Sequence, residues 1–179
     1  MTDYPDGPQG QLIIRFATSD DAETIHRAMI GIATVMGERE KVVSTPDDIR
    51  RYGFGERPAF EALLAETDGA VAGVCVFFSS FSTYLGRPGV YVQDLFVDER
   101  FRGLGVGAML LKRLAALTHE RGGCYIRLSV DAGNAQAQAF YTRLGLAHSG
   151  AEQIRAAYGE AFLALADADG VAEAHGGKK

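Results

Sequence analysis

Short apolar segments bounded by turn residues alternate along this chain with segments whose apolar residues recur every three or four positions. The first pattern predicts strands and the second predicts amphipathic helices. We expect strands over residues 12–16, 60–66, 71–79, 90–97, 125–130 and the first part of 153–165. We expect four helices. The first carries Ile25 to Met36, the second begins at Pro46, the third runs from Val106 to the glycines at 122–123, and the fourth covers residues 135–144.

Residues that start and stop helices flank the first two helical segments. Asp20 followed by Glu23 predicts a capping box before the first helix. Gly37 predicts a left-handed residue at its end. Thr45 as N-cap, with proline next and an acidic residue three positions on, predicts the start of the second helix.

Consecutive strands without an intervening helix predict an antiparallel meander. Asp68-Gly69 is typical of a hairpin turn, and a loop at residues 86–89 leads to the next strand. The order β-α-α-β-β-β-α-β-α-β predicts an α+β domain with helices packed on a largely antiparallel sheet. We expect this domain to occupy residues 11–165, between disordered segments at 1–10 and 166–179.

Composition and charge narrow the possible partners. The 179 residues are 47% hydrophobic and 23% charged, with a net charge of −5, so a basic nucleic-acid or membrane footprint is not expected. No apolar segment approaches the roughly 20 residues of a membrane span, and we expect a cytoplasmic protein. Cys75 and Cys124 lie in apolar segments and are expected to be reduced core thiols. The four histidines share no spacing, so no metal site is expected.

A glycine cluster, Arg102-Gly103-Leu104-Gly105-Val106-Gly107, separates a strand from a helix. Such a segment brings backbone N–H groups close to an anion at a helix N-terminus. A P-loop is excluded because its lysine is absent. A dinucleotide-binding turn, with Gly103, Gly105 and Ala108 followed by Asp131, and a loop that binds nothing are the remaining alternatives.

Four separated motifs together resemble the GCN5-related N-acetyltransferases (GNAT). They are Val92-Gln93-Asp94-Leu95-Phe96-Val97, Arg102-x-x-Gly105-x-Gly107, Asn134, and Phe140-Tyr141-x-x-Leu144-Gly145. The segment Tyr52-Gly53-Phe54-Gly55-Glu56-Arg57-Pro58 and the pair Tyr91-x-x-Asp94 resemble the diamine (spermidine/spermine, thialysine) acetyltransferase branch. The resemblance implies a GNAT-type mixed sheet flanked by helices and splayed between its fourth and fifth strands.

The resemblance also implies that acetyl-CoA is the cosubstrate. Its pyrophosphate would lie on the cradle, Arg102, Gly103, Leu104, Gly105, Val106, Gly107 and Ala108. Its pantetheine arm would pair with the strand edge at Leu95, Phe96 and Val97, where one N–H is a candidate oxyanion donor. Asn134 is either a contact to the cofactor or a plain N-cap.

The chemistry of amine acetylation selects two candidate catalytic residues. An alkylammonium must lose a proton before it attacks a thioester, so a base is needed. Relatives of the diamine branch carry an acidic residue where this chain has Gln93. Asp94 is then the nearest carboxylate, but on a regular strand it faces the side opposite Gln93. It can serve as the base if a β-bulge turns its side chain toward the site; otherwise it is a structural hydrogen-bonding group. The resemblance makes Tyr141 the donor to the departing thiolate, with packing against Leu144 as the alternative.

We therefore expect an N-acetyltransferase that acts by direct attack on a small primary amine: a diamine, a polyamine or a lysine-like amino acid. Gln93 and Ser82 stand where carboxylates are expected, which favours an acceptor with fewer positive charges or with its own carboxylate, although Glu38 and Glu40 can attract a cation. The alternatives are a protein or peptide amine, an amine antibiotic, or an acyl-CoA sensor without turnover. A homodimer is implied by the resemblance alone.

Overall fold

The computed structural model describes residues 10–150 and 153–166, which fall into two compact units, Met1–Ala137 and Gln138–Lys179. Most of the two segments predicted to be disordered, residues 1–9 and 167–179, lie outside the described residues. The strands are β1 (Ile13–Phe16), β2 (Glu61–Thr67), β3 (Ala70–Ser82), β4 (Arg87–Val97) and β5 (Ile126–Leu128). The α-helices are α1 (Ala22–Val35), α2 (Pro46–Phe54), α3 (Val106–Glu120), α4 (Ala135–Arg143) and α5 (Gly159–Ala166), and short 3-10 turns occupy Ser19–Asp21, Arg39–Lys41 and Glu99–Phe101.

The five strands form one sheet in the order β1-β2-β3-β4-β5, as the α+β prediction requires. The first four strands pair antiparallel, and β5 pairs parallel to β4. The parallel pairing extends only from Val90 with Ile126 to Val92 with Leu128, although β4 continues to Val97. The predicted splay between the fourth and fifth strands is therefore confirmed.

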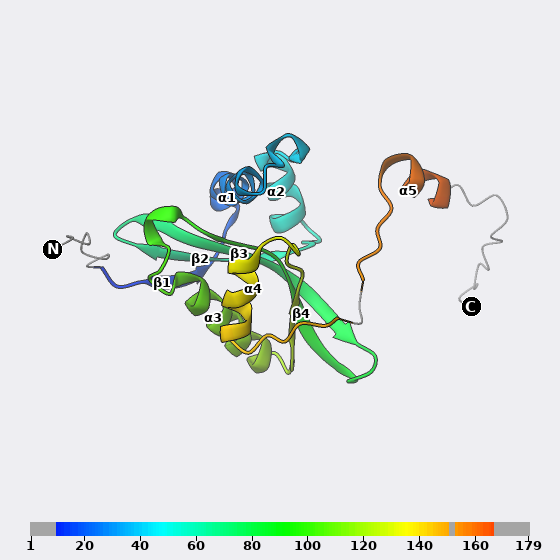
Figure 1. The fold of residues 1–179 in the computed structure, drawn as a ribbon. Helices are drawn as coiled ribbons and strands as arrows, with labels where there is room; N and C mark the ends of the chain where they lie inside the picture. Colours follow the sequence, from blue (N-terminus) through cyan, green and yellow to red (C-terminus); the bar gives the residue numbers. More distant parts are fainter. Residues whose placement is uncertain (1–9, 151–152, 167–179) are drawn as a thin grey trace, which may run out of the picture. The chain divides into compact units, whose positions relative to one another are not determined.

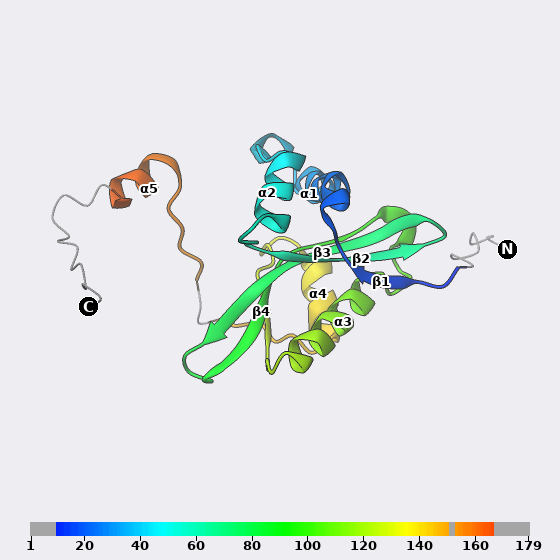
Figure 2. The same ribbon diagram turned by 180° about the vertical axis from the view of Figure 1, so that it is seen from behind.

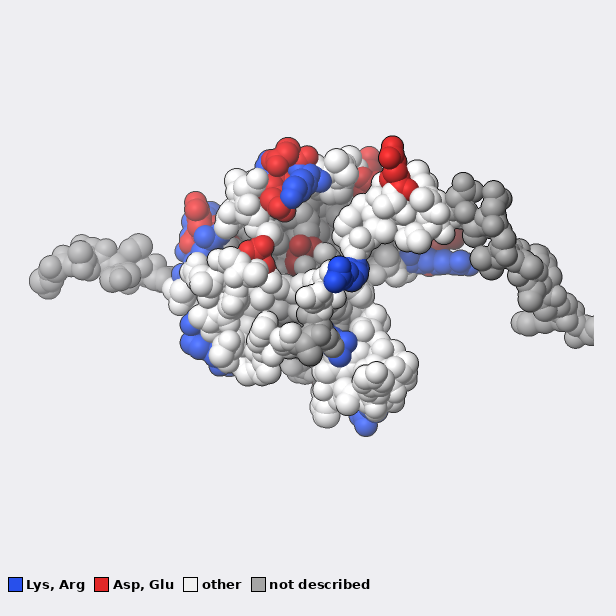
Figure 3. Space-filling view, turned by 45° about the vertical axis from the view of Figure 1, so that its right-hand side comes forward, with Lys and Arg blue, Asp and Glu red and all other residues white. Residues whose placement is uncertain are grey.

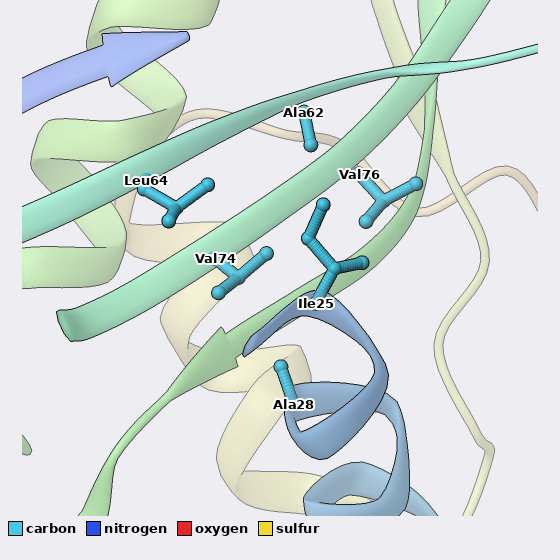
Figure 4. Close-up of a cluster of buried hydrophobic side chains, with 6 residues drawn as sticks. All are labelled: Ile25, Ala28, Ala62, Leu64, Val74 and Val76. Carbon is cyan, nitrogen blue, oxygen red and sulfur yellow. The ribbon is translucent and has the colours of Figure 1, made fainter. Parts of the chain in front are cut away.

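Helices cover both faces of this sheet, with α1 and α2 on one side and α3 on the other (Figures 1 and 2). Ile25 and Ala28 of α1 pack onto a patch contributed by β2 and β3 (Figure 4). That patch consists of Ala62, Leu64, Val74 and Val76. Burial of these apolar side chains fixes the register of β2 and β3, because a shift by one residue would turn them to the opposite face.

Gly73 allows α3 to approach the opposite face of the sheet. A Cβ atom on Gly73 would lie 2.9 Å from the carbonyl oxygen of Phe96 and 3.0 Å from side-chain atoms of Val106 and Leu110. Real side chains do not reach such distances without movement of the backbone or of the helix. The small residue on β3 thus sets the position of the first turn of α3.

Replacing Gly73 by alanine is therefore expected to lower the free energy of unfolding by roughly 1–3 kcal/mol, the usual cost of overpacking. Urea denaturation measures this change. Ser79→Ala, at an exposed position on the same strand, is the matched control and is expected to stay within about 0.5 kcal/mol of the wild type. Equal stability of both variants would contradict the close approach of α3.

Most predicted helices and strands are present, and four local predictions are wrong. The capping box before α1 is formed by Thr18 and Asp21, because Thr18 has the extended backbone that an N-cap needs, whereas Asp20 lies inside a 3-10 turn. The loop before β4 is shorter than expected, since pairing with β3 already begins at Arg87. Cys124 is exposed, whereas Cys75 is buried as predicted.

The predicted strand in residues 153–165 is also wrong. Residues 153–158 have no regular structure, and α5 follows at Gly159–Ala166. The segment Glu160-Ala161-Phe162-Leu163-Ala164-Leu165-Ala166 is rich in helix formers and has no β-branched residue. Local propensity thus decides this element.

Candidate active site

The glycine cluster forms an open backbone cradle at the start of α3. Gly103 and Gly105 have φ angles of +81° and +80°, in the left-handed region that favours glycine, and no atom lies within 4 Å of where their Cβ atoms would be. Gly105 is the N-cap of α3 and has no side chain to cap the first turn. The first helical hydrogen bond runs from the N–H of Met109 to the Gly105 carbonyl, at 3.0 Å. The N–H groups before Met109 therefore face a space suited to an anion.

The other cradle residues anchor this segment to the sheet. Arg102 donates from Nε to the carbonyl of Val97, at 3.2 Å, so the guanidinium is held at the end of β4. Val106 and Gly107 are buried beneath the first turn, while Leu104 is exposed. The buried residues Val106 and Gly107 thus hold the cradle against the sheet, its other side is open, and the positive charge of Arg102 lies beside it.

Among the described residues, the ladder between β4 and β5 ends at Val92, so the rest of this edge of β4 has no strand beside it. Leu95, Phe96 and Val97 lie on this edge, between the end of the ladder and the cradle. The N–H of Asp98 donates to the carbonyl of Ala72 on the β3 side, so by alternation the backbone groups of Phe96 pair with β3. Those of Leu95 and Val97 point to the open edge, and because the carbonyl of Val97 accepts from Arg102, the free pairing capacity consists of both groups of Leu95 and the N–H of Val97. A ligand with amide groups can add to such an edge.

A β-bulge lies in β4 beside this edge. Val76 pairs with Asp94 and Phe77 pairs with Val92, so Gln93 is an extra residue without a partner on β3. The bulge changes the alternation of β4 and puts Asp94 on the same face as Val76, which is the face covered by α1. Gln93 is exposed and Asp94 is half-buried.

Burial raises the pKa of the Asp94 carboxyl to about 6. Among the described residues, no hydrogen bond or ion pair offsets this loss of solvation. A carboxylate with this pKa is still mostly ionised at pH 7 and binds a proton more tightly than an ordinary aspartate. These are the properties of a general base, and they do not require Gln93 to take part.

The neighbouring thiol of Cys75 is chemically inert by comparison. Burial, and after it the negative charge of Asp94, raise its pKa to about 12. The thiolate is the nucleophilic form of cysteine, so Cys75 remains an unreactive core residue at neutral pH.

The remaining two predicted site residues are on or before α4. Asn134 accepts from the N–H of Ala137 through Oδ1, at 3.0 Å, and therefore caps this helix. Tyr141 lies on the part of α4 that belongs to the second unit, where its ring meets that of Phe140 edge to face, with centroids 5.1 Å apart. The structure thus brings together Asp94, the strand edge and the cradle within the first unit.

Charged side chains gather over the helices of the first unit, but with both signs interleaved (Figure 3). Glu38 forms an ion pair with Lys41 at 2.5 Å, and Arg50 pairs with both Glu23 and Asp47. Glu38 is therefore already partnered, which reduces its value as a site for an added cation. The described residues contain no helix that could span a membrane and no cluster of metal-ligating side chains.

Sequence reasoning missed a hydrogen bond that joins the two strands where they separate. The hydroxyl of Tyr91 on β4 and that of Ser129, which follows β5, are 2.6 Å apart. The Tyr91 ring also stacks on Phe78, with centroids 5.1 Å apart. The alternation of Tyr125, Arg127 and Ser129 along β5 is the sequence signal for a polar face here.

Comparison with known proteins identifies this arrangement. The family model of the acetyltransferase (GNAT) family matches residues 31–146, which include the bulge, the strand edge, the cradle and α4. The chain belongs to the GNAT acetyltransferase family. It is 31% identical over 142 residues to the thialysine N-epsilon-acetyltransferase of Bos taurus, covering 75% of this chain and 83% of that protein. It is 32% identical over 92 residues to the L-ornithine N5-acetyltransferase of Arabidopsis thaliana, covering 50% of this chain and 40% of that protein.

Solved structures agree on the fold of this GNAT chain. An integron cassette protein from the mobile metagenome of V. cholerae matches with a TM-score of 0.74 at 19% identity, covering 87% of this chain and 98% of that one. The family and the largely antiparallel sheet exclude the dinucleotide-binding alternative, which requires a doubly wound parallel sheet. The protein is therefore an acyl-transferring enzyme of the GNAT type.

Proposed function

We propose that this GNAT enzyme transfers the acetyl group of acetyl-CoA to a primary amine of a small molecule by direct attack. The observation that carries the proposal is Asp94, a half-buried carboxyl of raised pKa that the bulge presents beside the unpaired edge of β4. A base, an edge for an amide-bearing ligand and an anion cradle then follow one another along one stretch of chain.

The residues fit acetyl-CoA in both charge and shape. The open space above Gly103 and Gly105, the uncapped first turn of α3 and the guanidinium of Arg102 suit a pyrophosphate. The edge at Leu95 and Val97 suits the two amides of a pantetheine arm, and one of its N–H groups suits the thioester oxygen. When bound there, acetyl-CoA supplies the thioester carbonyl that the amine attacks.

Asp94 performs the proton transfer that limits amine attack. At pH 7 an alkylammonium with a pKa of about 10.4 is neutral in about one molecule in 2,500, which corresponds to about 4.6 kcal/mol. Asp94 accepts the ammonium proton, directly or through a water molecule, and the neutral nitrogen then forms its bond to the acetyl carbon. The second nitrogen proton leaves as the tetrahedral intermediate collapses and replaces the one given to the thiolate. The carbon–sulfur bond breaks, and the Tyr141 hydroxyl donates a hydrogen bond or a proton to the departing thiolate.

Direct attack is favoured over a cysteinyl intermediate because neither thiol suits the second route. Cys75 is buried with its pKa raised to about 12. The N–H of Cys124 donates to the carbonyl of Pro88, so this residue lies at the end of β5 away from the point where the strands separate. A nucleophilic cysteine would have to lie at the other end of β5, where β4 and β5 separate.

The relatives support a small amine as the acceptor. The matched enzymes from Bos taurus and Arabidopsis thaliana are named for thialysine and L-ornithine. Gln93 and Ser82 in place of carboxylates disfavour a polyamine with several positive charges. We propose a lysine-like amino acid or a short diamine as acceptor, with the cytoplasm as location and a homodimer as assembly, the last two from resemblance and composition only.

Replacing Tyr141 by phenylalanine is expected to lower kcat/KM at least about tenfold on the best acceptor, equal to roughly 1.4 kcal/mol of transition-state stabilisation. The measurement is release of the CoA thiol with a panel of amines: lysine, ornithine, short diamines, spermidine, a peptide amine and an aminoglycoside. Phe140→Leu, which changes the adjacent ring without removing a hydroxyl, is the control for packing.

The panel separates the possible functions. Turnover of lysine-like amino acids or diamines supports the proposal. Turnover confined to the peptide or to the aminoglycoside would instead make that compound class the acceptor. An unchanged rate in Tyr141→Phe would assign this tyrosine to packing.

A further inference from the structure

Asp94 lies between a part of β4 that α1 covers and a part that extends beyond this helix. Phe96, two residues further along the strand, packs against α1 so closely that a Cβ atom on Gly31 would lie 2.6 Å from its Cε2 atom. Side chains two residues apart on a strand share a face, so Phe96 and Asp94 both project toward α1. The contact between Phe96 and Gly31 closes this side of the carboxyl. An elongated acceptor that reaches Asp94 therefore extends in the opposite direction along β4.

Two aromatic rings come next on this face in that direction. Phe78 of β3 lies two residues beyond Val76, the partner of Asp94, and pairs with Tyr91 of β4. The two rings are stacked, with centroids 5.1 Å apart and an interplanar angle of 23°. Both residues are half-buried, and Figures 1 and 2 show the β3–β4 hairpin that carries them extending past α1 and α2. We name Phe78 and Tyr91 the aromatic pair; part of its surface is exposed beside Asp94.

Contacts on the β5 side hold the aromatic pair in place. The hydroxyl of Tyr91 is 2.6 Å from that of Ser129, which fixes the tilt of the Tyr91 ring. Arg127 is the register partner of Tyr91, but its Cζ lies 5.7 Å from the centre of the Tyr125 ring, so these two side chains are engaged with one another. A surface that is already ordered loses little conformational entropy when a ligand binds to it.

This arrangement matches an ammonium group followed by methylene groups. The carboxylate of Asp94 attracts the ammonium and then accepts its proton, as proposed above. Val76, Phe78 and Tyr91, which adjoin Asp94 on this face, bear no charge at neutral pH. Methylene groups that leave water for the surface of aromatic rings gain free energy through the hydrophobic effect. The first part of the acceptor chain is thus recognised as apolar.

The spacing defines the length of chain that the aromatic pair contacts. The partners of Asp94 and Tyr91 are two residues apart on β3, which separates the two positions by about 7 Å. Four or five carbon–carbon bonds extend about 5 to 6 Å. A shorter chain leaves part of the ring surface uncovered, and atoms beyond this length pass the aromatic pair.

We infer that Phe78 and Tyr91 are specificity-determining residues of the acceptor site, because their rings bind the methylene chain of the amine and set the preferred chain length. The inference rests on the proposed function. It adds two assigned residues and a direction of binding, with the reacting nitrogen at Asp94 and the chain running toward the turn between β3 and β4.

The test uses n-alkylamines from ethylamine to hexylamine, which carry one ammonium group and differ only in chain length. In the wild type, kcat/KM from release of the CoA thiol is expected to rise about fourfold per methylene, equal to about 0.8 kcal/mol, and to level off near pentylamine. The ratio of kcat/KM for pentylamine to that for ethylamine is then about 60-fold. Tyr91→Ala and Phe78→Ala are each expected to lower this ratio below about tenfold.

The ratio is taken within one variant, so a smaller fraction of folded enzyme does not change it. Phe78→Leu, which keeps an apolar side chain at this position, is expected to retain a larger ratio than Phe78→Ala. Tyr91→Phe, which loses the bond to Ser129 but keeps the ring, is expected to retain a larger ratio than Tyr91→Ala.

Phe81→Ala is the matched control, because Phe81 is a phenylalanine of the same strand, is 62% exposed and projects from the opposite face to Phe78. It is expected to keep the wild-type ratio. A wild-type ratio in both alanine variants, or no rise with chain length in the wild type, would overturn the role of the aromatic pair and leave the proposed acetyl transfer intact. Absence of wild-type turnover on every alkylamine, lysine and diamine would instead count against the proposed function.

Discussion

Replacing Asp94 by asparagine is expected to lower kcat/KM for the amine acceptor by about 10²–10⁴-fold, the usual contribution of a general base. Asparagine keeps the size of the side chain and its place on the bulge but cannot accept the ammonium proton. Because the pKa of Asp94 is raised to about 6, wild-type kcat/KM is expected to fall on the acid side with a midpoint near pH 6. The variant is expected to lack this acid limb in a pH–rate profile.

The same substitution is expected to raise stability at neutral pH, which distinguishes loss of a base from misfolding. Below about pH 4 the carboxyl is protonated in both the folded and the unfolded chain, so it causes no penalty. Between pH 3.8 and about 6 the unfolded chain ionises this carboxyl while the folded chain keeps it protonated, so wild-type stability falls with rising pH across this window and is lowest above it. Asp94→Asn removes this penalty, on the order of 2 kcal/mol at pH 7.

Urea denaturation at pH 4 and pH 7 measures the effect, and the advantage of the variant is expected only at the higher pH. Glu99→Gln, at an exposed carboxylate just beyond β4, is the control and is expected to change neither activity nor stability. Full activity in Asp94→Asn would transfer the role of base to another group or to water and would leave Asp94 a structural residue.

Replacing Gly105 by tryptophan is expected to weaken binding of acetyl-CoA by at least about 100-fold. The Cβ position of Gly105 opens into the space above the first turn of α3, where an indole ring would stand in place of the pyrophosphate. A non-glycine residue at a φ angle of +80° also costs roughly 1–2 kcal/mol of stability, which a folded domain of this size tolerates. Isothermal titration calorimetry with acetyl-CoA and with CoA measures the loss.

Gly122→Trp is the matched control for this substitution. Gly122 has the same φ angle of +80°, has no atom within 4 Å of its Cβ position, and lies at the other end of α3. Its strain is therefore equivalent, but its effect on acetyl-CoA binding is expected to be negligible. If the two variants bind acetyl-CoA equally well, the pyrophosphate does not bind at Gly105. Gly107→Trp is the poorer test, because Gly107 is buried and a tryptophan there disturbs the helix itself.

Helix starts and ends that depend only on neighbouring residues were predicted closely from the sequence. Thr45, Pro46 and Asp48 predicted the start of α2, whose capping box is present, and Gly37 has the left-handed φ of +70° expected after α1. Such features depend on a few neighbouring residues and their hydrogen bonds. The prediction of a strand failed at residues 153–165, where helix formers without β-branched residues form α5.

The sequence alone determined the family, the order of the elements as far as α4, and the chemical type of each motif, because glycines, caps and apolar periods act over a few residues. Only the tertiary structure decided that Gln93 is the extra residue of the bulge and that Asp94 faces α1, since a bulge depends on pairing with β3. Only the tertiary structure placed Phe78, Tyr91, Tyr125 and Arg127 on one face, since they come from three strands. The raised pKa of Asp94 likewise follows from burial by residues distant in sequence, which no local pattern encodes.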